Sequence, residues 1–479
     1  MTTTPDAPAP AQTGLGVRTL TTIVVGSMVG AGVFSLPRQF SAETGVAGSL
    51  VAWSVAGFGT LMLALVFQML AVRRPDLDAG VYAYAKAGFG EYLGFFSAFG
   101  YWASACVGNV TYWVLVMSTL GAVVPALGDG DTPLAVAVAS VGLWLMFALV
   151  RRGVREATAI NRIVTVAKLV PIVVFVLIAA FAVDPAVLAE NWHGGADAGS
   201  LLDQVRGTML ATVFVFLGVE GASTYSRHAR RRSDVGRATL LGFASVLALF
   251  SSVTLVSYGI LPADEIAALR EPSMAGVLEA VVGSWGGALV SIGLIVSVLG
   301  AYLAWTLMAA EVMLVAAKAG DMPRFLRRTN AADAPVPALF LSACVSQSVL
   351  LLTLLSSDAF DFAFDLTSSL VLVPYALAAW YALRLVLRRD TFADGGSRGR
   401  WVLVAALASV YTVWLLYAAG LAYLLIGFLA YAPASVLFVM ARREQGRRVF
   451  SGRELVVLAV SVAGAVVALV ALATGTITV

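Results

Sequence analysis

Two glycine-rich interruptions of long apolar segments are the features best suited to bind a ligand. The first covers residues 26–32 (GSMVGAG), inside a stretch long enough to cross a bilayer. Glycine costs a helix interior about 1 kcal/mol relative to alanine, and bare backbone groups at bilayer depth are tolerated only beside protein or a polar cavity. The second covers residues 217–221 (LGVEG), five apolar segments later. Paired interruptions in the two halves of a chain are typical of a secondary transporter's binding site.

The chemistry of the first interruption suits an α-amino acid. Freed amides at Ala31, Gly32 and Val33 would begin a half-helix, whose N-terminus attracts a carboxylate. Freed carbonyls near Gly26 would attract an ammonium group. The alternative is a helix-packing surface, because Gly26 and Gly30 form a Gly-xxx-Gly pair. We favour a binding cavity because the interruption recurs.

Three ionisable residues lie within predicted membrane segments, and one of them, Glu311, falls toward the cytoplasmic end of its segment and is interpreted as an ion-pair partner. A charge deep within such a segment is costly and indicates a functional site. Glu220, inside the second interruption, is predicted to act in binding or gating; the alternative is a structural hydrogen bond that holds the break open. Lys168 is predicted to be a structural or coupling cation rather than a substrate ligand.

Trp305 and Asn109 are candidates for the contact with the substrate's polar head group. Trp305 lies mid-membrane, away from the interface where tryptophan usually collects, and tryptophan is the best cation–π partner for a guanidinium or ammonium group. Asn109 offers a buried amide. The alternatives are core packing for Trp305 and, for Asn109, an interhelical hydrogen bond worth about 0.6 kcal/mol.

The elements that must position these residues are membrane-spanning helices. The chain has 479 residues, of which 60% are hydrophobic and 12% charged, with a mean hydropathy of +0.89. Soluble domains carry about 25% charged residues. Solid apolar runs of about 20 residues predict helices rather than a β-barrel. The predicted segments are 17–40 (broken), 46–71, 89–124, 132–150, 157–183, 203–226 (broken), 236–260, 283–317, 337–357, 362–387, 401–419, 422–441 and 455–475.

Charged loops set the predicted orientation. Arginine and lysine gather in the loops after even-numbered segments, whereas aspartate and glutamate gather in the odd-numbered loops. The positive-inside rule places the even loops in the cytoplasm, so the N-terminus is cytoplasmic, and the chain is predicted to be a multi-pass protein of the plasma (inner) membrane. Residues 1–14, rich in Thr, Pro and Ala, are predicted to be a disordered cytoplasmic tail rather than a signal peptide.

The sequence gives no support to several function classes. It contains no nucleophile–base pair and no metal-ligand spacing, so an enzyme, a metal or another cofactor is not expected. It contains no GxxxxGK[ST] motif for ATP-driven transport. Cys106 and Cys344 fall in apolar runs and are interpreted as small core residues. The basic loops are ordinary topology signals, so nucleic-acid binding is not expected.

Several stretches resemble known transporters. Residues 26–37 (GSMVGAGVFSLP) resemble the first-helix signature of the amino acid–polyamine–organocation superfamily. The match extends through residues 75–85 (PDLDAGVYAYA), 101–102 (YW), 108–109 (GN) and 216–223 (FLGVEGAS). Within this superfamily the chain is similar to the basic amino acid/polyamine antiporters, and most similar to the arginine:ornithine antiporters.

The resemblance implies an all-α polytopic fold with a five-plus-five inverted repeat, in which helices 1 and 6 are broken. Twelve core helices and a thirteenth are expected. The transport core would cover residues 15–388, with helices 1–5 at about 15–183 and helices 6–10 at about 203–388. Residues 400–479 would form the accessory helices 11–13.

The resemblance also implies site roles. Ala31 stands where agmatine-exchanging relatives have serine, Phe214 stands at their gate tryptophan, and Lys168 resembles the lysine that replaces sodium in ion-independent relatives. The implied substrate-binding residues are Met28, Gly30, Ala31, Gly32, Ser104, Ala105, Asn109, Tyr112, Phe214, Leu217, Trp305 and Thr367. The implied gating or coupling residues are Glu220, Lys168, Tyr82, Tyr101 and Tyr375.

The implied function is exchange of arginine for ornithine by alternating access at one central site. Both amino acids carry one net positive charge near neutral pH, so one-for-one exchange would be electroneutral. The alternatives are a proton-coupled symporter or uniporter for lysine or another cationic amino acid, an amino acid/amine (polyamine) antiporter, a non-transporting sensor and a channel. The expected partners are the small-molecule substrate and membrane lipid, and a homodimer is left open.

Overall fold

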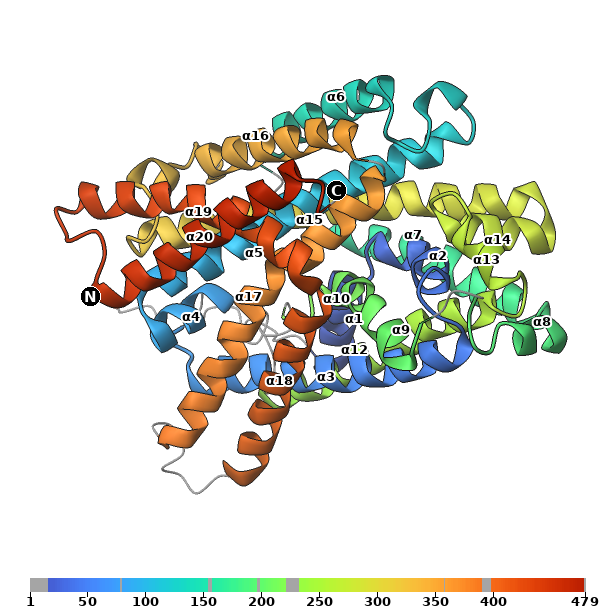
Figure 1. Ribbon diagram of the computed structural model, residues 1–479, viewed down its shortest axis with the longest axis horizontal. Coiled ribbons are helices and arrows are strands. Elements are labelled where there is room, and N and C mark those ends of the chain that lie inside the picture. Colours follow the sequence, from blue (N-terminus) through green and yellow to red (C-terminus); the bar gives the residue numbers. More distant parts are fainter. Residues whose placement is uncertain are drawn as a thin grey trace, which may run out of the picture.

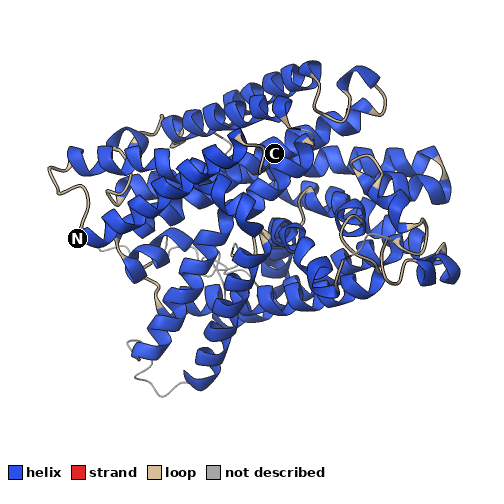
Figure 2. Cartoon of the chain, viewed as in Figure 1, coloured by secondary structure: helices blue, strands red, loops and turns tan. Residues whose placement is uncertain are grey.

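The computed structural model describes residues 16–77, 80–153, 157–195, 199–220, 232–356, 358–389 and 398–477. Within these ranges the chain consists of helices and short connections, without a strand (Figure 2). The all-helical prediction is therefore confirmed. The predicted tail at residues 1–14, and the part of the second break that follows Glu220, lie outside the described residues.

Among the described residues, ten helices are long and apolar enough to cross a membrane, or eleven if a bent first pair counts as one span. They correspond to predicted segments whose apolar residues favour burial in lipid or against other helices. The ten helices are α3 (Val46–Arg73), α5 (Glu91–Gly121), α6 (Pro133–Val150), α12 (Arg232–Ser257), α15 (Ser284–Lys318), α16 (Val336–Leu352), α17 (Ala359–Arg388), α18 (Arg398–Ala418), α19 (Gly420–Glu444) and α20 (Gly452–Ala473).

The remaining predicted segments also contain helices. The fifth is α7 (Ala157–Phe181) and the sixth includes α9 (Leu201–Gly207) and α10 (Met209–Phe216). Shorter helices fill the connections: α4 (Val81–Phe89), η2 (Pro125–Leu127), α8 (Pro185–Glu190), α13 (Ala263–Ala267), α14 (Ser273–Val282), η4 (Arg324–Arg327) and η5 (Thr353–Leu355).

The first predicted segment is broken at its glycines. Helix α1 (Val17–Met28) ends where Val29 adopts an extended conformation, with φ −76° and ψ 97°. The chain resumes as the 3₁₀ helix η1 (Gly32–Ser35) and the short helix α2 (Leu36–Ser41). The axis bends by 49° across the break. The predicted interruption is therefore present.

The second predicted break begins where α10 ends. Leu217 leaves the helix in an extended conformation with ψ 135°, and the following Gly218 has a φ of +97°. Residues that carry a side chain rarely adopt a backbone conformation with positive φ, whereas glycine adopts it readily. Glycine at position 218 thus lets the chain turn out of the helical path at bilayer depth.

A glycine corner, meaning a glycine with positive φ that joins a short helix to the long helix after it, occurs once in each half of the chain. Gly90, with φ +96°, joins the short helix α4 to the long helix α5. Gly283, with φ +83°, joins the short helix α14 to the long helix α15 in the same way. In both places the short helix packs closely on the long one that follows it. The recurrence supports two related halves.

The connections sort into two ends of the molecule. The loop after the seventh span contacts the loop after the third, where Arg270 Nε lies 2.9 Å from Asp129 Oδ1. At the other end, Lys86 Nζ, after the second span, lies 2.9 Å from Asp321 Oδ2, after the eighth. Odd-numbered loops therefore meet odd-numbered loops and even-numbered loops meet even ones, as successive crossings of a bilayer require.

Helix α5 forms the centre of the core. In the most apolar 18-residue stretch of α5, 94% of the residues are buried, which is a larger share than in any other candidate span described. It packs against α15 and α17, while α1 packs against α12. Figure 1 shows α1 and α10 together near the middle of the molecule, and α6 with α16 along one edge. The two broken segments thus lie inside the bundle.

Candidate functional site

The two breaks face each other. Ser27 Oγ donates a hydrogen bond to the Gly218 carbonyl oxygen over 3.2 Å. A Cβ atom on Gly218 would lie 2.6 Å from the Ser27 carbonyl oxygen, so a side chain would not fit there. The sequence predicted each break separately, and the folded chain brings the two into direct contact.

Unpaired backbone amides gather at the first break. The N–H groups of Gly30, Ala31, Gly32 and Val33 have no hydrogen-bond acceptor among the residues that the structure describes. The first amides of any helix lack an internal partner and carry part of the positive end of its dipole. The start of η1 is therefore suited to a carboxylate, and carboxylate binding at this break stays a prediction.

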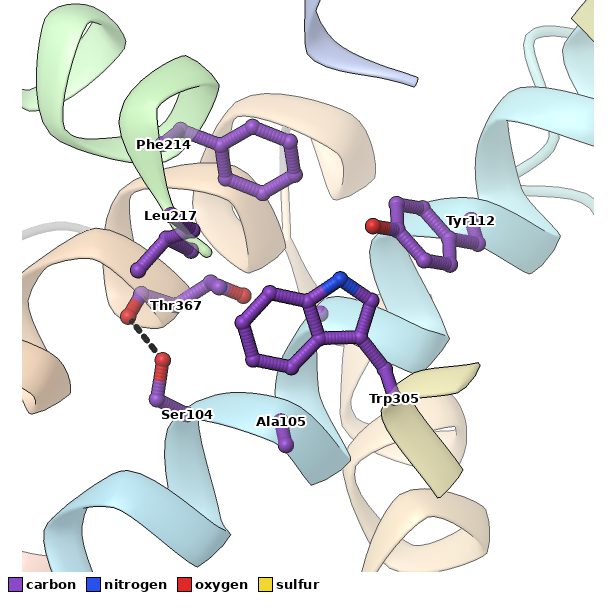
Figure 3. Close-up of a pocket in the computed structure, with 8 residues that line it drawn as sticks. Ser104, Ala105, Tyr112, Phe214, Leu217, Trp305 and Thr367 are labelled. Carbon is purple, nitrogen blue, oxygen red and sulfur yellow. Dashed lines mark hydrogen bonds between the residues drawn. The ribbon is translucent and has the colours of Figure 1, made fainter. Parts of the chain in front are cut away.

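A small pocket lies beside the breaks (Figure 3). Its volume is about 10 Å³, which is room for about one water molecule. An amino acid could enter only if the surrounding helices separated. The pocket is lined by Ser104, Ala105, Gly108 and Tyr112 of α5, Phe214 of α10 with Leu217 at its end, Trp305 of α15 and Thr367 of α17.

Seven of the twelve predicted substrate-binding residues line this pocket. Gly30 and Gly32 lie close to it, because a Cβ atom on Gly30 would be 3.3 Å from Tyr112 Oη and one on Gly32 would be 2.6 Å from Phe214 Cδ1. Met28 and Ala31 are buried in the same broken segment.

Gly108 was missed by the sequence reasoning. Its only sequence signal was its position beside Asn109. A Cβ atom on Gly108 would lie 3.2 Å from Thr367 Cγ2, so the absence of a side chain keeps α5 and α17 close at the pocket.

Trp305 and Asn109 provide the groups suited to a cation. The Trp305 ring extends across the pocket in Figure 3, and its centroid lies 6.1 Å from that of Tyr101. Asn109 does not line the pocket, but its Nδ2 donates to Thr306 Oγ1 over 3.0 Å, one residue along α15 from Trp305. Asn109 Oδ1 is buried without a hydrogen-bond partner among the described residues. An orphaned acceptor and an aromatic ring each suit a guanidinium or ammonium group.

Hydrogen bonds fix the wall formed by α5 and α17. Ser104 Oγ donates to the Thr367 carbonyl oxygen over 2.7 Å (Figure 3). Thr367 Oγ1 donates to the Ala363 carbonyl oxygen, also over 2.7 Å. Both hydroxyl protons are thus engaged within the protein, and the hydroxyl oxygens keep acceptor capacity for a donor on a substrate.

Stacked aromatic rings cover one side of the pocket. The Phe214 ring on α10 stacks on the Phe364 ring on α17, with centroids 4.1 Å apart and planes inclined by 21°. Phe364 lies on α17 between Asp361, near the odd-loop end, and Thr367 in the pocket wall. Phe364 was not among the predicted residues. This layer separates the pocket from the end of the molecule where α17 begins.

A carboxylate held by two tyrosines lies near the pocket. Tyr101 Oη donates to Glu220 Oε1 and Tyr375 Oη donates to Glu220 Oε2, each over 2.6 Å. The bonds join the second break to α5 and α17. The structure thus brings together three of the predicted gating residues.

Tyr82 lies apart from that group. Its hydroxyl donates to Asp321 Oδ2 over 2.6 Å, in the same cluster as Lys86 at the even-loop end. Tyr82 lies on α4, before the glycine that starts α5, so its hydrogen bond is at the even-loop end and not with Glu220. Its gating role stays a prediction.

Lys168 contacts the first break directly. Its Nζ donates to the Gly26 carbonyl oxygen over 2.6 Å, and the residue is 3% exposed. A helix break frees carbonyl oxygens that need a donor. The ammonium group supplies one, which agrees with the predicted structural or coupling role rather than with a substrate ligand.

A larger cavity lies on the other side of the wall that α5 and α17 form beside the small pocket. It has a volume of about 740 Å³ and is lined almost entirely by apolar side chains of α5, α16, α17 and α19. Trp102 and Leu366 line this cavity, whereas their neighbours Ser104 and Thr367 line the small pocket. The large cavity lacks the polar groups that an amino acid requires. The small pocket is therefore the candidate site.

Known proteins resemble this chain over nearly its whole length. The family model described as "Amino acid permease" matches residues 15–460. An arginine/ornithine antiporter of Pseudomonas aeruginosa is 48% identical over 96% of this chain and 97% of the relative. An L-lysine transport protein of Corynebacterium glutamicum is 40% identical over 97% and 96%. A putative arginine/ornithine antiporter of Escherichia coli is 40% identical over 93% and 96%.

Proposed function

This chain belongs to the amino acid permease family and is a membrane transporter rather than an enzyme, and we propose that it exchanges external arginine for internal ornithine. The observation that carries the proposal is the pairing of two kinds of group in the lining of one small pocket and directly beside it. Free amides at the first break suit a carboxylate, and Trp305 with Asn109 suits a cation. The Pseudomonas aeruginosa relative, named as an arginine/ornithine antiporter, supports the same substrate pair.

The absence of a free carboxylate from the pocket lining favours exchange of like charges. No acidic residue lines the small pocket among the described residues, and Glu220 nearby already accepts hydrogen bonds from Tyr101 and Tyr375. The ring of Trp305 can therefore attract a cationic side chain without a full countercharge. Because arginine and ornithine carry the same net charge, one-for-one exchange moves no net charge.

Alternating access accounts for a pocket that is too small to hold an amino acid in this conformation. The Phe214–Phe364 stack covers the side toward the start of α17, and the Tyr101–Glu220–Tyr375 group lies on another side. In the proposed cycle a bound substrate stabilises the closed conformation more than either open one, so the loaded carrier reorients faster than the empty carrier.

The transport core in this proposal covers residues 15–388, and residues 400–479 add accessory helices. The repeated glycine corner supports two related halves within the core. By the distribution of charged loops, the N-terminus and the even loops are cytoplasmic, in the plasma (inner) membrane. Lipid surrounds the spans, and a homodimer remains a hypothesis for crosslinking in membranes to test.

A second candidate function is lysine transport by a proton-coupled symporter or uniporter. It is favoured by the Corynebacterium glutamicum relative, which is named as an L-lysine transport protein. Lysine also combines an α-amino acid group with a cationic side chain, so the pocket chemistry alone does not separate the two substrates.

The test is transport into proteoliposomes that contain only the purified protein. Vesicles are loaded with ornithine, lysine, agmatine, putrescine or buffer, and the uptake of labelled arginine from outside is followed. We expect fast uptake with internal ornithine and almost none with internal buffer. Equal uptake into buffer-loaded vesicles would contradict exchange. Faster arginine uptake with internal agmatine or putrescine than with internal ornithine would show that the amine, and not ornithine, is the exchanged substrate.

A separate experiment distinguishes a lysine uniporter or symporter from the exchanger. Labelled lysine is supplied to vesicles without internal amino acid, with and without an inward proton gradient. Accumulation driven by that gradient would favour the second candidate function, and no accumulation favours the exchanger.

A further inference from the structure

The odd-loop end of the transport core is held closed by one arginine among three carboxylates. Arg38 Nη2 lies 2.7 Å from Asp358 Oδ2 and 3.1 Å from Asp361 Oδ2. Arg38 Nη1 lies 3.9 Å from Glu271 Oε1. We call Glu271, Asp358 and Asp361 the outer carboxylate cluster, because the charge of the loops places this end outside the cell.

The outer carboxylate cluster is built on elements of fixed geometry. Asp358 caps α17, where its Oδ1 accepts hydrogen bonds from the amides of Phe360 and Asp361. Asp361 Oδ1 also accepts a hydrogen bond from Gln39 Nε2 over 2.5 Å. Glu271 Oε2 accepts one from the Ser273 amide over 2.9 Å. The carboxylates are therefore positioned by the protein and not by Arg38 alone.

Negative charge exceeds positive charge here. Two carboxylates, Asp358 and Asp361, lie within hydrogen-bond distance of the one guanidinium group of Arg38, and the carboxyl group of Glu271 lies 3.9 Å from it. Glu43 adds a further carboxyl group, and its pKa is raised by burial and then by the charge of Asp361. The surroundings of Arg38 thus favour a cation more strongly than one guanidinium group can satisfy.

Glu271 is the member of the cluster with an unused acceptor. Its side chain is 3% exposed, and Oε1 has no hydrogen-bond partner within the described ranges. The nearest cationic atom, Arg38 Nη1 at 3.9 Å, is beyond hydrogen-bond distance. A buried acceptor without a donor is costly and rare, and burial favours the protonated form of this carboxyl group while the outer end is closed. Oε1 of Glu271 faces the position that the guanidinium group of Arg38 occupies in this conformation.

Arg38 is attached to the element that must move when the site opens. It lies in α2, directly after η1 and the first break. Its amide donates to Ser273 Oγ over 3.1 Å, so the backbone is tied to the same loop as the side chain. If α2 swings away in the outward-open conformation, the outer carboxylate cluster stays behind on α17 and the α13–α14 loop. Carboxylates left without their cation would attract another.

From this arrangement we propose that the outer carboxylate cluster is an outer binding site for the cationic side chain of the substrate. Arg38 occupies the site when the outer end is closed, and the guanidinium or primary ammonium group of an incoming amino acid replaces it when that end opens. The site and the central pocket share α17, with the Phe214–Phe364 stack between them. This inference rests on the proposed function, because only a cationic substrate would bind there.

Two variants that break the same ion pairs distinguish a binding site from a contact that only holds the outer end closed. Arg38→Ala frees the carboxylates, so we expect the half-saturating concentration of external arginine to fall. Asp358→Asn combined with Asp361→Asn removes two carboxylates, so we expect it to rise. Partly exposed ion pairs of this kind correspond to a change of about 1.5- to fivefold in each direction. Asparagine also caps helices well, so α17 keeps its start.

The measurement compares the two faces of the membrane. Labelled arginine uptake is measured at initial rate in right-side-out and inside-out vesicles loaded with ornithine. We expect the half-saturating arginine concentration to change on the outer face of the membrane and to stay constant on the inner face. Glu265→Gln is the control, because Glu265 is an exposed acid on α13 at the same end of the molecule. It should leave both values unchanged.

Several outcomes would overturn the inference. If both variants shift the outer value in the same direction, or neither does, the cluster only holds the outer end closed. An equal shift on the inner face would mean a general change of conformation. If the double variant does not insert, Asp361→Asn alone is judged by the same criterion. A wild-type protein that exchanges no cationic amino acid would instead refute the proposed function, independently of the variants.

Discussion

Gly32 and Phe214 touch across the two broken segments. A Cβ atom at position 32 would lie 2.6 Å from Phe214 Cδ1 and 2.8 Å from Val215 Cγ1. The first residue of η1 therefore packs directly against the half-helix α10, beside the pocket and below the aromatic stack. This contact links the amides proposed to bind the carboxylate to the ring proposed to cover the site.

Gly32→Val should abolish exchange while the protein still inserts into the membrane. The added side chain would push α10 and its Phe214 ring away from η1, and overpacking of this kind costs about 1–3 kcal/mol. Arginine/ornithine exchange in proteoliposomes and size-exclusion chromatography measure the two effects. Gly427→Ala is the control, because that glycine lies in α19 with nothing within 4 Å of an added Cβ. Wild-type exchange by Gly32→Val would mean that the break does not bind the carboxylate.

Trp305→Ala should weaken the binding of arginine. A cation–π contact is worth about 0.5–2 kcal/mol, which corresponds to an affinity loss of about two- to thirtyfold. Trp305→Phe should fall between the wild type and the alanine variant. The measurement is arginine binding to purified protein by calorimetry. Trp285→Ala, on the same helix and 55% exposed, should bind as the wild type does, and an unchanged affinity in Trp305→Ala would remove the cation–π assignment.

Tyr375→Phe should slow exchange and lower the stability of the protein. The substitution removes the 2.6 Å hydrogen bond to Glu220 Oε2 but keeps the ring. A buried carboxylate that loses a donor costs about 1–3 kcal/mol. Thermal unfolding and exchange rate are measured together. Tyr92→Phe loses the hydrogen bond with Ser435 of α19, near the start of α5 and about three turns before Ser104, and should affect stability alone. A Tyr375→Phe variant with full exchange activity would argue against a gating role for the Glu220 group.

Exchange should not require sodium. Lys168 Nζ already places a positive charge 2.6 Å from the Gly26 carbonyl oxygen at the first break. Replacement of sodium by choline in both compartments should therefore leave the exchange rate unchanged. Lys168→Met should abolish exchange, because the freed carbonyl loses its donor. A strict sodium requirement in the wild type would show that Lys168 does not take the place of an ion.

Closure of the outer end should weaken as the pH rises from about 4.5 to about 8. Burial raises the pKa of Glu271 from 4.5 to about 8, although Arg38, the Ser273 amide and the neighbouring Ser35 hydroxyl lower it, and Asp361 raises it further. In an open, hydrated conformation the pKa returns toward its ordinary value. The closed conformation thus holds a proton that the open one has released, so closing takes up a proton and becomes less favourable as protons become scarce.

Amide hydrogen exchange tests this pH dependence. Protection of the peptide that covers α2 should decrease between about pH 5 and about pH 9, after correction for intrinsic rates. The decrease should be absent in Glu271→Gln, which stays neutral at every pH. The same pH profile in both proteins would assign the effect to another group.

The positions of the spans and of both breaks could be predicted from the sequence, because these are local properties. Hydropathy marks a span wherever about 20 apolar residues follow one another, and the glycines at 26–32 and 217–221 interrupt the helices at those positions. Trp305 and Glu220 were candidates because polar or amphipathic groups at bilayer depth are rare. Several pocket residues, such as Ser104 and Thr367, were named only through resemblance to known transporters.

The partners of the charged and polar groups could not be predicted in this way. Arg38 lies far in sequence from Asp358, and nothing in either loop indicates that they meet. Gly90 and Gly283 gave no signal that each starts a long helix with a positive φ. Tyr82 belongs to the same residue type as Tyr101 and Tyr375, yet it lies in a different cluster.

By itself, then, the sequence determined an all-helical membrane transporter with two broken spans, since apolar length and glycine act on each segment independently. Only the tertiary structure decided which side chains from distant helices meet, as Tyr101 and Tyr375 do on Glu220. The physical reason is that apolar helices are nearly interchangeable in lipid, where hydropathy fixes neither rotation nor neighbour. Close packing and the need of each buried charge for a partner select one arrangement.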